Sequence, residues 1–196
     1  EKIAIKIRTI EFLSALDMFC LVILIIMQTL TAMKMAMNNK LLEQKAYTDA
    51  HTGLPNKDAC ELLLNTPEKV KESTACMMFD LNNLKIVNDT MGHEAGDRLI
   101  LNACGCLTDV FGVDAVFRIG GDEFLVICKQ IDENTLIKRI TELKELMNER
   151  SVNMASGVIW SENVITGFNE MLREAEEKMY ADKARYYKEK GIERRK

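Results

Sequence analysis

Three acidic residues stand where apolar runs of the sequence end. Asp80 directly follows the run ACMMF. Asp122 and Glu123 separate the runs AVFRI and FLVIC, and Gly120 and Gly121 come just before them. Short apolar runs bounded by turn residues are typical of buried strands, and two of them joined by glycines and an acid predict a β-hairpin. If the strand before Asp80 is a neighbour of this hairpin, three carboxylates converge at one edge of a sheet.

A cluster of this kind is costly unless a cation compensates it, because carboxylates a few ångströms apart raise one another's pKa. Hard oxygen ligands suit Mg²⁺ or Mn²⁺, and such sites commonly handle a nucleoside triphosphate. The spacing alone leaves a second interpretation open, in which the residues form a solvated acidic turn. A calcium loop starting at Asp80 is excluded, because Leu84 stands where a ligand is needed and no glycine follows at the sharp turn.

The elements that would position these residues alternate between helix and strand. The predicted strands cover residues 75–79, 115–119, 124–128 and 152–160, and the predicted helices cover residues 56–65, 82–89, 97–110, 136–147 and 168–190. Asn56 and Asn82 are expected to cap the helices that they begin, and MGHEAGD is expected to form a turn. This mixture predicts an α/β (α+β) domain with a central mixed sheet flanked by helices.

The N-terminal part of the chain has a different composition. Residues 12–33 carry one charge, Asp17, and as a helix they would span about 33 Å, enough to cross a bilayer. We therefore predict a membrane segment at 1–33, with a transmembrane helix at about 12–33; a very apolar buried helix or a coiled-coil seam is the alternative. Basic residues flank the run on both sides, so charge does not orient it. Residues 34–47 predict a signalling helix or linker.

The chain as a whole is moderately acidic. Its formal net charge is −4 over 196 residues, which gives no reason to expect a nucleic-acid polymer as partner. The first residue is Glu1 rather than methionine. We therefore expect the chain to be a piece of a longer protein, with a sensor region upstream.

Several ordered segments resemble a known family. RIGGDEF and FDLNNLKIVNDTMGHEAGD resemble the GGDEF family of diguanylate cyclases, and TDAHTGLPNK and AEEKMYADK are similar to its opening and closing segments. The resemblance covers the chain from about Tyr47 to the end, with the GGDEF catalytic domain expected at residues 48–196. It implies a helix-flanked sheet like that of nucleotide cyclases and polymerase palms. It also implies condensation of two GTP into cyclic di-GMP with release of two pyrophosphates. Because each subunit holds one GTP, a homodimer is implied, with its catalytic domain on the cytoplasmic side of a bacterial cell membrane.

The resemblance implies roles for individual residues as well. Asp80, Asp122 and Glu123 match the catalytic acids and metal ligands, with Mg²⁺ or Mn²⁺ as the metal, and Leu81 would lend a backbone carbonyl. Glu123 could serve as a metal ligand or help to deprotonate the 3′-hydroxyl. The matched substrate-binding residues are Asn88 and Asp97 for guanine, Lys85 and Lys183 for phosphate, the backbone near Asn83 and Leu84, and Gly120 and Gly121 at the hairpin tip.

The chain departs from the family pattern in several places. Asn82 stands where a second aspartate is common, and Asn83 and Leu84 replace an aromatic pair. Tyr187 occupies the position of a C-terminal arginine. An Arg-x-x-Asp product-inhibition motif is replaced by FGVD, with Phe111 in place of the arginine, so we expect no product feedback through that site. The alternative function is a degenerate GGDEF domain that acts as a GTP-binding signalling module.

Overall fold

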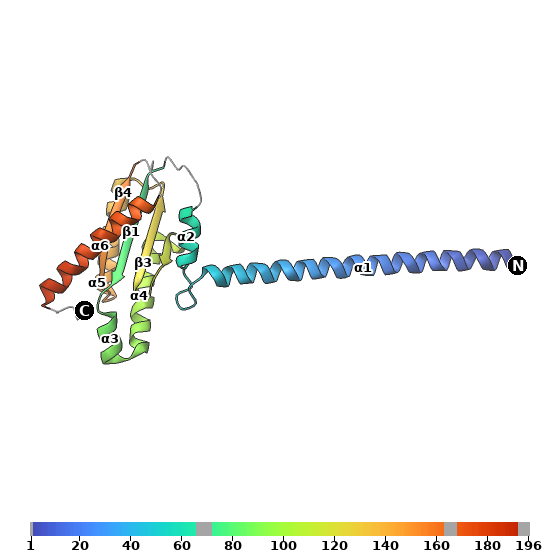
Figure 1. Cartoon of the computed structure of the whole chain (residues 1–196), viewed down its shortest axis with the longest axis horizontal. Helices are drawn as coiled ribbons and strands as arrows, with labels where there is room; N and C mark the ends of the chain where they lie inside the picture. The colour runs from blue at the N-terminus through green and yellow to red at the C-terminus, as the bar shows by residue number, and fades with distance from the viewer. Residues whose placement is uncertain (1, 66–71, 163–167, 192–196) are drawn as a thin grey trace. The chain divides into compact units, whose positions relative to one another are not determined.

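A computed structural model describes residues 2–65, 72–162 and 168–191. The chain divides into two compact units, Glu1–Ala46 and Tyr47–Lys196. The described residues of the first unit belong to α1 (Lys2–Tyr47), so the apolar run and the polar segment after it form one continuous helix (Figure 1). The part Leu16–Tyr47 is long and apolar enough to cross a membrane, and the side chains described along it are exposed.

The second unit has the predicted α/β fold, built on a four-stranded sheet in the order β2-β3-β1-β4. Its elements are α2 (Lys57–Asn65), β1 (Thr74–Leu81), α3 (Leu84–Met91), α4 (His93–Phe111), the 3-10 turn η1 (Val113–Ala115), β2 (Val116–Arg118), β3 (Glu123–Lys129), α5 (Glu133–Glu149), β4 (Met154–Ser161) and α6 (Phe168–Lys190). The pairings between these strands are all antiparallel rather than mixed. Parallel pairing is limited, within the described residues, to an isolated bridge between Asn56 and Arg118.

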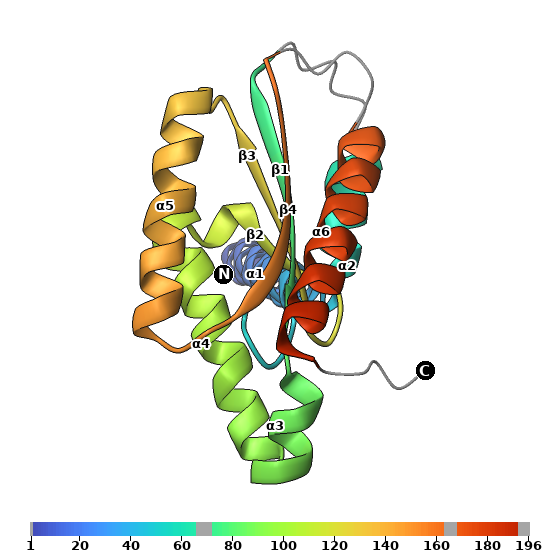
Figure 2. The same cartoon turned by 90° about the vertical axis from the view of Figure 1, so that its left-hand side faces the viewer.

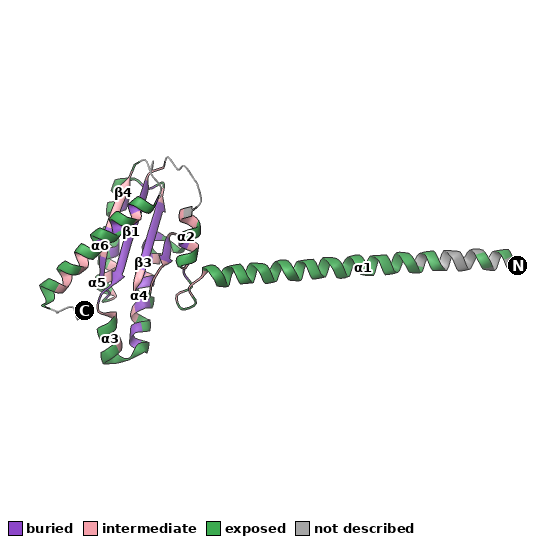
Figure 3. Ribbon diagram, viewed as in Figure 1, coloured by how far each residue is buried: buried purple, intermediate pink, exposed green. Residues whose placement is uncertain are grey.

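Successive apolar side chains of a strand point to opposite faces of the sheet and so belong to two separate cores. In β1, Met77 and Phe79 pack with residues of α4 and α5, whereas Cys76 and Met78 pack with residues of α2 and α6. Figure 2 shows these two helix layers on opposite sides of the sheet, and Figure 3 shows the buried positions gathered in the strands between them. Because successive side chains of a strand point to opposite faces, Asp80 belongs to the face that α2 and α6 cover.

The predicted helix starts have different outcomes. Asn56 caps α2 as expected, since its Oδ1 accepts a hydrogen bond from the Ala59 N–H at 3.0 Å. Asn82 does not cap a helix: it is buried, and its side-chain amide donates to Asn153 Oδ1 at 2.6 Å. The predicted turn at MGHEAGD is also wrong, because Gly92 alone separates α3 from α4. The other predicted elements lie within a few residues of their expected bounds.

Two backbone groups of the edge strand β4 bond side chains of α6. The Ser156 N–H donates to Asp182 Oδ2 at 2.9 Å, and the Lys178 ammonium donates to the Val158 carbonyl at 3.2 Å. Edge strands otherwise present unpaired groups that another strand can join. Helix α6 therefore covers one face of the sheet and also occupies part of its edge.

Gly157 sets how closely α6 approaches β4. A Cβ at this position would lie 1.9 Å from the Ala175 carbonyl oxygen and 2.5 Å from the Met179 nitrogen, both in the backbone of α6. Backbone atoms of a packed helix cannot move aside as a flexible side chain can, so only glycine fits here.

We expect Gly157→Ala to destabilise the domain by about 1–3 kcal/mol, because it forces β4 and α6 apart. Thermal unfolding of residues 47–196 should show a fall in Tm of about 3–10 °C. Gly121→Ala is the matched control, since a Cβ there meets no atom within 4 Å. Equal Tm values for the two variants would contradict this account of the packing.

Candidate active site

The pairing of β1 with β3 brings the predicted acids together. Asp80 lies directly opposite Glu123 in the antiparallel register, and the Leu81 N–H donates to the Asp122 carbonyl at 2.8 Å. Strand β1 therefore continues one residue beyond Asp80 and joins the hairpin tip. Asp80 is 2% exposed, while Asp122 and Glu123 are half-buried. The backbones of all three acids thus meet at one end of the sheet.

Helix α6 supplies a positive charge to this cluster. Lys183 donates a hydrogen bond from its ammonium to Asp80 Oδ2, and both side chains are largely shielded from solvent. The pairing follows from the fold, because Asp80 points to the face that α6 covers. A carboxylate buried without such a partner would carry a large desolvation penalty. Lys183, predicted from its resemblance to a phosphate-binding lysine, therefore lies beside the acids.

The pKa of Glu123 is raised above its ordinary value, mainly by burial and then by the charges of Asp80 and Asp122, whereas Lys183 opposes the rise. Gly120 makes room for this side chain, since a Cβ at Gly120 would lie 2.7 Å from Glu123 Oε2. The raised pKa means that the ionised form of Glu123 is disfavoured in the folded protein. A nearby cation would reverse that effect.

The donor set fits a hard divalent cation, because Asp80, Asp122 and Glu123 offer carboxylate oxygens and Leu81 offers a backbone carbonyl. Positive charge would relieve the crowding that raises the pKa of Glu123. Among the described residues, no three His, Cys, Asp or Glu side chains are already grouped as ligands of one ion. The backbone positions of the acids are therefore set by the sheet, and their side chains would have to turn toward a metal.

The turn between β1 and α3 is tied to distant elements. The Asn82 N–H donates to the Asn153 carbonyl at 2.9 Å. Asn83 has a left-handed backbone with φ 65°, and its side-chain amide donates to the Tyr186 hydroxyl of α6 at 2.6 Å. Asparagine tolerates this conformation better than most residues, which suits it to the turn. Leu84 begins α3, and Lys85 is exposed on its first turn.

The predicted guanine-binding pair lies on the hairpin of α3 and α4. Asn88 packs against Gly96, where a Cβ would lie 1.9 Å from Asn88 Oδ1, and Asp97 is the next residue along α4. Asp97 is exposed, and its Oδ1 lies 3.7 Å from His51 Nε2. The two predicted residues are thus brought together by the close packing of the two helices at a glycine.

Sequence reasoning missed two residues that hold the site together. Tyr186 bonds Asn83, as described above. Arg118 donates to Asp49 Oδ1 at 2.9 Å and to the Gly121 carbonyl at 2.8 Å, so it joins the hairpin tip to the segment before α2. Arg118 could have been noticed as the first residue of RIGGDEF, whereas nothing in the sequence singles out Tyr186 from Tyr187 beside it.

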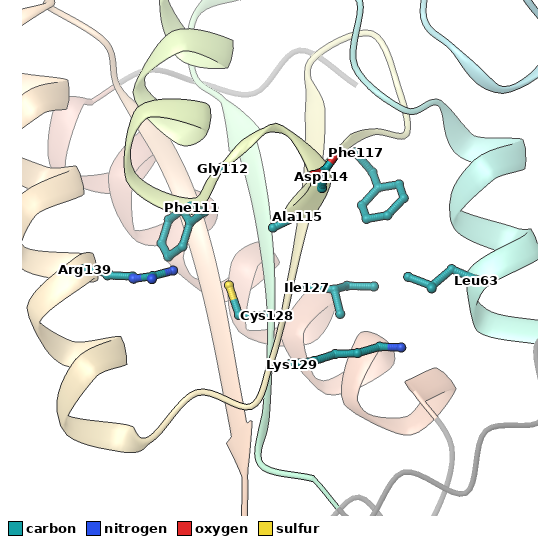
Figure 4. A pocket seen from close by; sticks show the side chains of 10 residues that line it. All are labelled: Leu63, Phe111, Gly112, Asp114, Ala115, Phe117, Ile127, Cys128, Lys129 and Arg139. Carbon is teal, nitrogen blue, oxygen red and sulfur yellow. The ribbon is translucent and has the colours of Figure 1, made fainter. Parts of the chain in front are cut away.

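A hollow of about 360 Å³ lies on another part of the domain, at the position of the expected product-inhibition motif (Figure 4). Its lining includes Phe111 and Asp114, together with Arg139 of α5 and Lys129 of β3. Phe111 is 7% exposed and belongs to the core. The residue in place of the motif's arginine is therefore committed to packing.

Replacing Glu123 tests the charge cluster without any assay of activity. In chelator at pH 7, Glu123→Gln should raise Tm by about 1–3 °C, because it removes an ionised group whose pKa is raised by folding. The gain should vanish as the pH falls below the ordinary pKa of a glutamate, where Glu123 is protonated in both states. Mg²⁺ should stabilise the parent more than the variant. Glu145→Gln, which removes the same charge at an exposed position, is the control. An equal rise of Tm with Mg²⁺ in the two variants would contradict the cluster.

Most of this chain is similar in sequence to known proteins. The family described as diguanylate cyclase, GGDEF domain, matches residues 46–188. The signaling protein YkoW of Bacillus subtilis is 28% identical over 161 residues, which cover 74% of this chain and 20% of YkoW. The cyclic di-GMP phosphodiesterase PdeB of Shewanella oneidensis is 31% identical over 154 residues, which cover 74% of this chain and 18% of PdeB. The diguanylate cyclase DgcN of Escherichia coli is 28% identical over 121 residues, which cover 59% of this chain and 30% of DgcN. The chain spans less than a third of each relative.

Solved structures give the same fold. The coiled coil and GGDEF domain of DgcB from Caulobacter crescentus, in complex with c-di-GMP, has a TM-score of 0.70 at 20% identity, covering 80% of this chain and 91% of that one. A microbial GGDEF domain with a novel mode of interaction with cyclic di-GMP has a TM-score of 0.64 at 26% identity, covering 74% and 94%. With a family match over most of its length and this fold, the chain belongs to the GGDEF domain family of diguanylate cyclases.

Proposed function

We propose that this protein is a diguanylate cyclase that condenses two GTP into cyclic di-GMP and releases two pyrophosphates. The observation that carries the proposal is the meeting of Asp80, Asp122 and Glu123 at one end of the sheet, with Lys183 beside them. Family membership and relatives such as the diguanylate cyclase DgcN support it.

The acids would hold Mg²⁺ or Mn²⁺, with Asp80, Asp122 and Glu123 as side-chain ligands and Leu81 as a carbonyl ligand. When bound, the metal would neutralise triphosphate charge and polarise the phosphate under attack. Glu123 has a raised pKa, so it binds a proton more readily than an ordinary carboxylate. That property suits a group that helps to take the proton from the 3′-hydroxyl, and the role of metal ligand is equally open to it.

The remaining site residues would bind the nucleotide. Asn88 and Asp97 would read guanine, whose N1 and N2 hydrogens a carboxylate accepts; adenine lacks the 2-amino group, and such a mismatch can discriminate by about 10⁴. Lys85, Lys183 and the backbone N–H groups near Asn83 and Leu84 would contact the phosphates. Gly120 and the exposed Gly121, where an added Cβ would meet no atom within 4 Å, would let the hairpin tip approach the nucleotide.

Two copies of the chain would form the complete site. The product has two-fold symmetry, because each 3′-hydroxyl attacks the α-phosphate of the other GTP, so two facing half-sites suit the reaction. We further propose that residues 1–33 anchor the protein in a bacterial cell membrane, that residues 34–47 carry a signal from an upstream sensor region, and that residues 48–196 form the catalytic domain in the cytoplasm. The long apolar stretch of α1 supports the anchoring.

A second candidate function is a GTP-binding signalling module without turnover. Asn82 in place of the usual aspartate and Tyr187 in place of the arginine favour it. One relative, PdeB, is named a phosphodiesterase rather than a cyclase. Incubation of the dimer with GTP and Mg²⁺, followed by detection of cyclic di-GMP, separates the two functions.

Asp122→Ala should reduce formation of cyclic di-GMP by at least about a hundredfold, because loss of a metal-binding carboxylate removes several kcal/mol of charge stabilisation. The fold should survive, since Asp122 is at a hairpin tip and contributes little to the core. Asp58→Ala, an exposed change on α2, is the control. Activity of the Asp122 variant within tenfold of the parent would refute the site, and a parent that binds GTP without turning it over would favour the signalling module.

Product feedback through the hollow of Figure 4 should be absent. Phe111 is packed into the core and offers no charge and no hydrogen-bond donor to a guanine or phosphate edge. The cations of the hollow, Lys129 and Arg139, come from β3 and α5 and not from the position of the motif's arginine. Titration of cyclic di-GMP into the protein by calorimetry, with the active site filled by a non-hydrolysable GTP analogue, should give no submicromolar binding. Such binding, if lost in Asp114→Ala, would mean that the site works without its arginine.

A further inference from the structure

The apolar part of α1 carries most of its polar side chains on one face. Within residues 12–33 these side chains are Ser14, Asp17, Gln28, Thr29 and Thr31. All except Thr29 lie at alternating steps of three and four residues, a spacing that keeps side chains on one face of a helix. Leu21 and Leu24 occupy the two positions of this series between Asp17 and Gln28. Thr29 lies elsewhere and donates its hydroxyl to the Ile26 carbonyl of its own helix at 2.8 Å.

We call this face the seam and define it by Asp17, Leu21, Leu24, Gln28, Thr31 and Met35. All six side chains are exposed, and four of them line a shallow hollow along the helix. Thr31 donates its hydroxyl to the Met27 carbonyl at 2.8 Å. The Gln28 amide has no hydrogen-bond partner within the part of the chain that the structure describes.

Gln28 would lie inside the hydrocarbon if residues 12–33 cross a membrane. It is about 8 Å from the middle of that run, and the hydrocarbon core extends about 15 Å to either side of its midplane. A primary amide carries both donors and an acceptor, and lipid tails offer it neither. The group that matches it best is a second amide of the same kind, because the donor of each copy can bond the acceptor of the other.

We propose that α1 pairs in parallel with α1 of a second copy of this chain along the seam, with the two Gln28 amides bonded across the two-fold axis. The inference rests on the proposed function, which needs two membrane-anchored copies with their domains on the same side. Alternating spacings of three and four residues average 3.5, the repeat that two helices keep in register by a left-handed crossing. Polar side chains at such an interface bond across helices and fix the register.

The two ends of the seam fit this arrangement. Asp17 is as far from the middle of the apolar run as Gln28, about 8 Å, so it too lies at the depth of the hydrocarbon. Ionisable side chains at that depth almost always face another helix rather than lipid, which agrees with a place on the seam. Beyond the run, the same spacing continues through Asn38 and Leu42, outside the predicted membrane segment. The pattern of the seam therefore continues into the signalling helix. Two helices paired along it would stay in the same register up to the start of the catalytic domains.

Disulfide cross-linking in membranes tests which face pairs. Leu24→Cys, on the seam, and Ile26→Cys, on the opposite face, are each placed in a Cys20→Ala background; the other cysteines are buried. The whole chain is reconstituted in phosphatidylethanolamine–phosphatidylglycerol vesicles and oxidised. We expect a covalent dimer from Leu24→Cys and little from Ile26→Cys. Equal yields, or a preference for Ile26→Cys, would overturn the seam, and so would absence of any dimer, which would point to a different partner.

The contribution of the amide is tested by energy transfer between labelled chains in the same vesicles. Gln28→Leu should weaken association by about three- to tenfold, which lies within the range measured for single polar contacts between membrane helices. Thr29→Leu removes a polar group one residue away, off the seam, and should leave association unchanged. Similar effects of the two substitutions would overturn the role of Gln28.

A separate measurement distinguishes failure of the seam from failure of the proposed function. Residues 47–196, a compact unit with its own core, are fused to a parallel dimeric coiled coil and supplied with GTP and Mg²⁺. If the fusion makes cyclic di-GMP but α1 of the whole chain does not pair in vesicles, the seam is refuted and the cyclase function stands. If α1 pairs in vesicles but the fusion makes no cyclic di-GMP, the seam stands and the cyclase function is refuted.

Discussion

Asp80 and Glu123 face each other because β1 and β3 pair in one particular antiparallel register. A slip of one residue would turn Asp80 to the opposite face of the sheet, among the apolar residues that pack against α4 and α5. The apolar residues on both sides of β1 prevent such a slip, since each has its own core to fill. The register therefore brings the acids together, directs them to α6 and determines that Lys183 can reach them.

Helix α6 is the second element on which the site depends. Gly157 allows its backbone to lie almost in contact with β4, and this closeness puts Lys183 within reach of Asp80 and Tyr186 within reach of Asn83. Because the contacts come from neighbouring turns of one helix, a shift of α6 would disturb the acid cluster and the turn before α3 together. Packing at Gly157, which lies opposite Met78 in β1 and two residues along from the position opposite Asp80, thus supports the geometry around the acids.

Much of this fold could be predicted from sequence, because local patterns decide it. The apolar runs around RIGGDEF predict the hairpin of β2 and β3, and the bounds of α6 agree with its predicted range. The prediction that Asn82 caps a helix is wrong because its side chain bonds Asn153, 71 residues away, instead of a neighbouring N–H. The pairs Lys183–Asp80 and Asn83–Tyr186 each join residues 103 positions apart, and no local pattern reports such a contact. The roles of the site residues stay predictions until they are measured.

The bonds from α6 to the edge of β4 have a consequence for proteins that are held close together. Domains tethered side by side meet at about millimolar effective concentration, where an open sheet edge invites a strand from its neighbour. Here Asp182 and Lys178 already bond the N–H of Ser156 and the carbonyl of Val158. Collisions of such domains at the β4 edge can therefore remain reversible, because these two groups are not free to pair with a strand of the neighbouring domain.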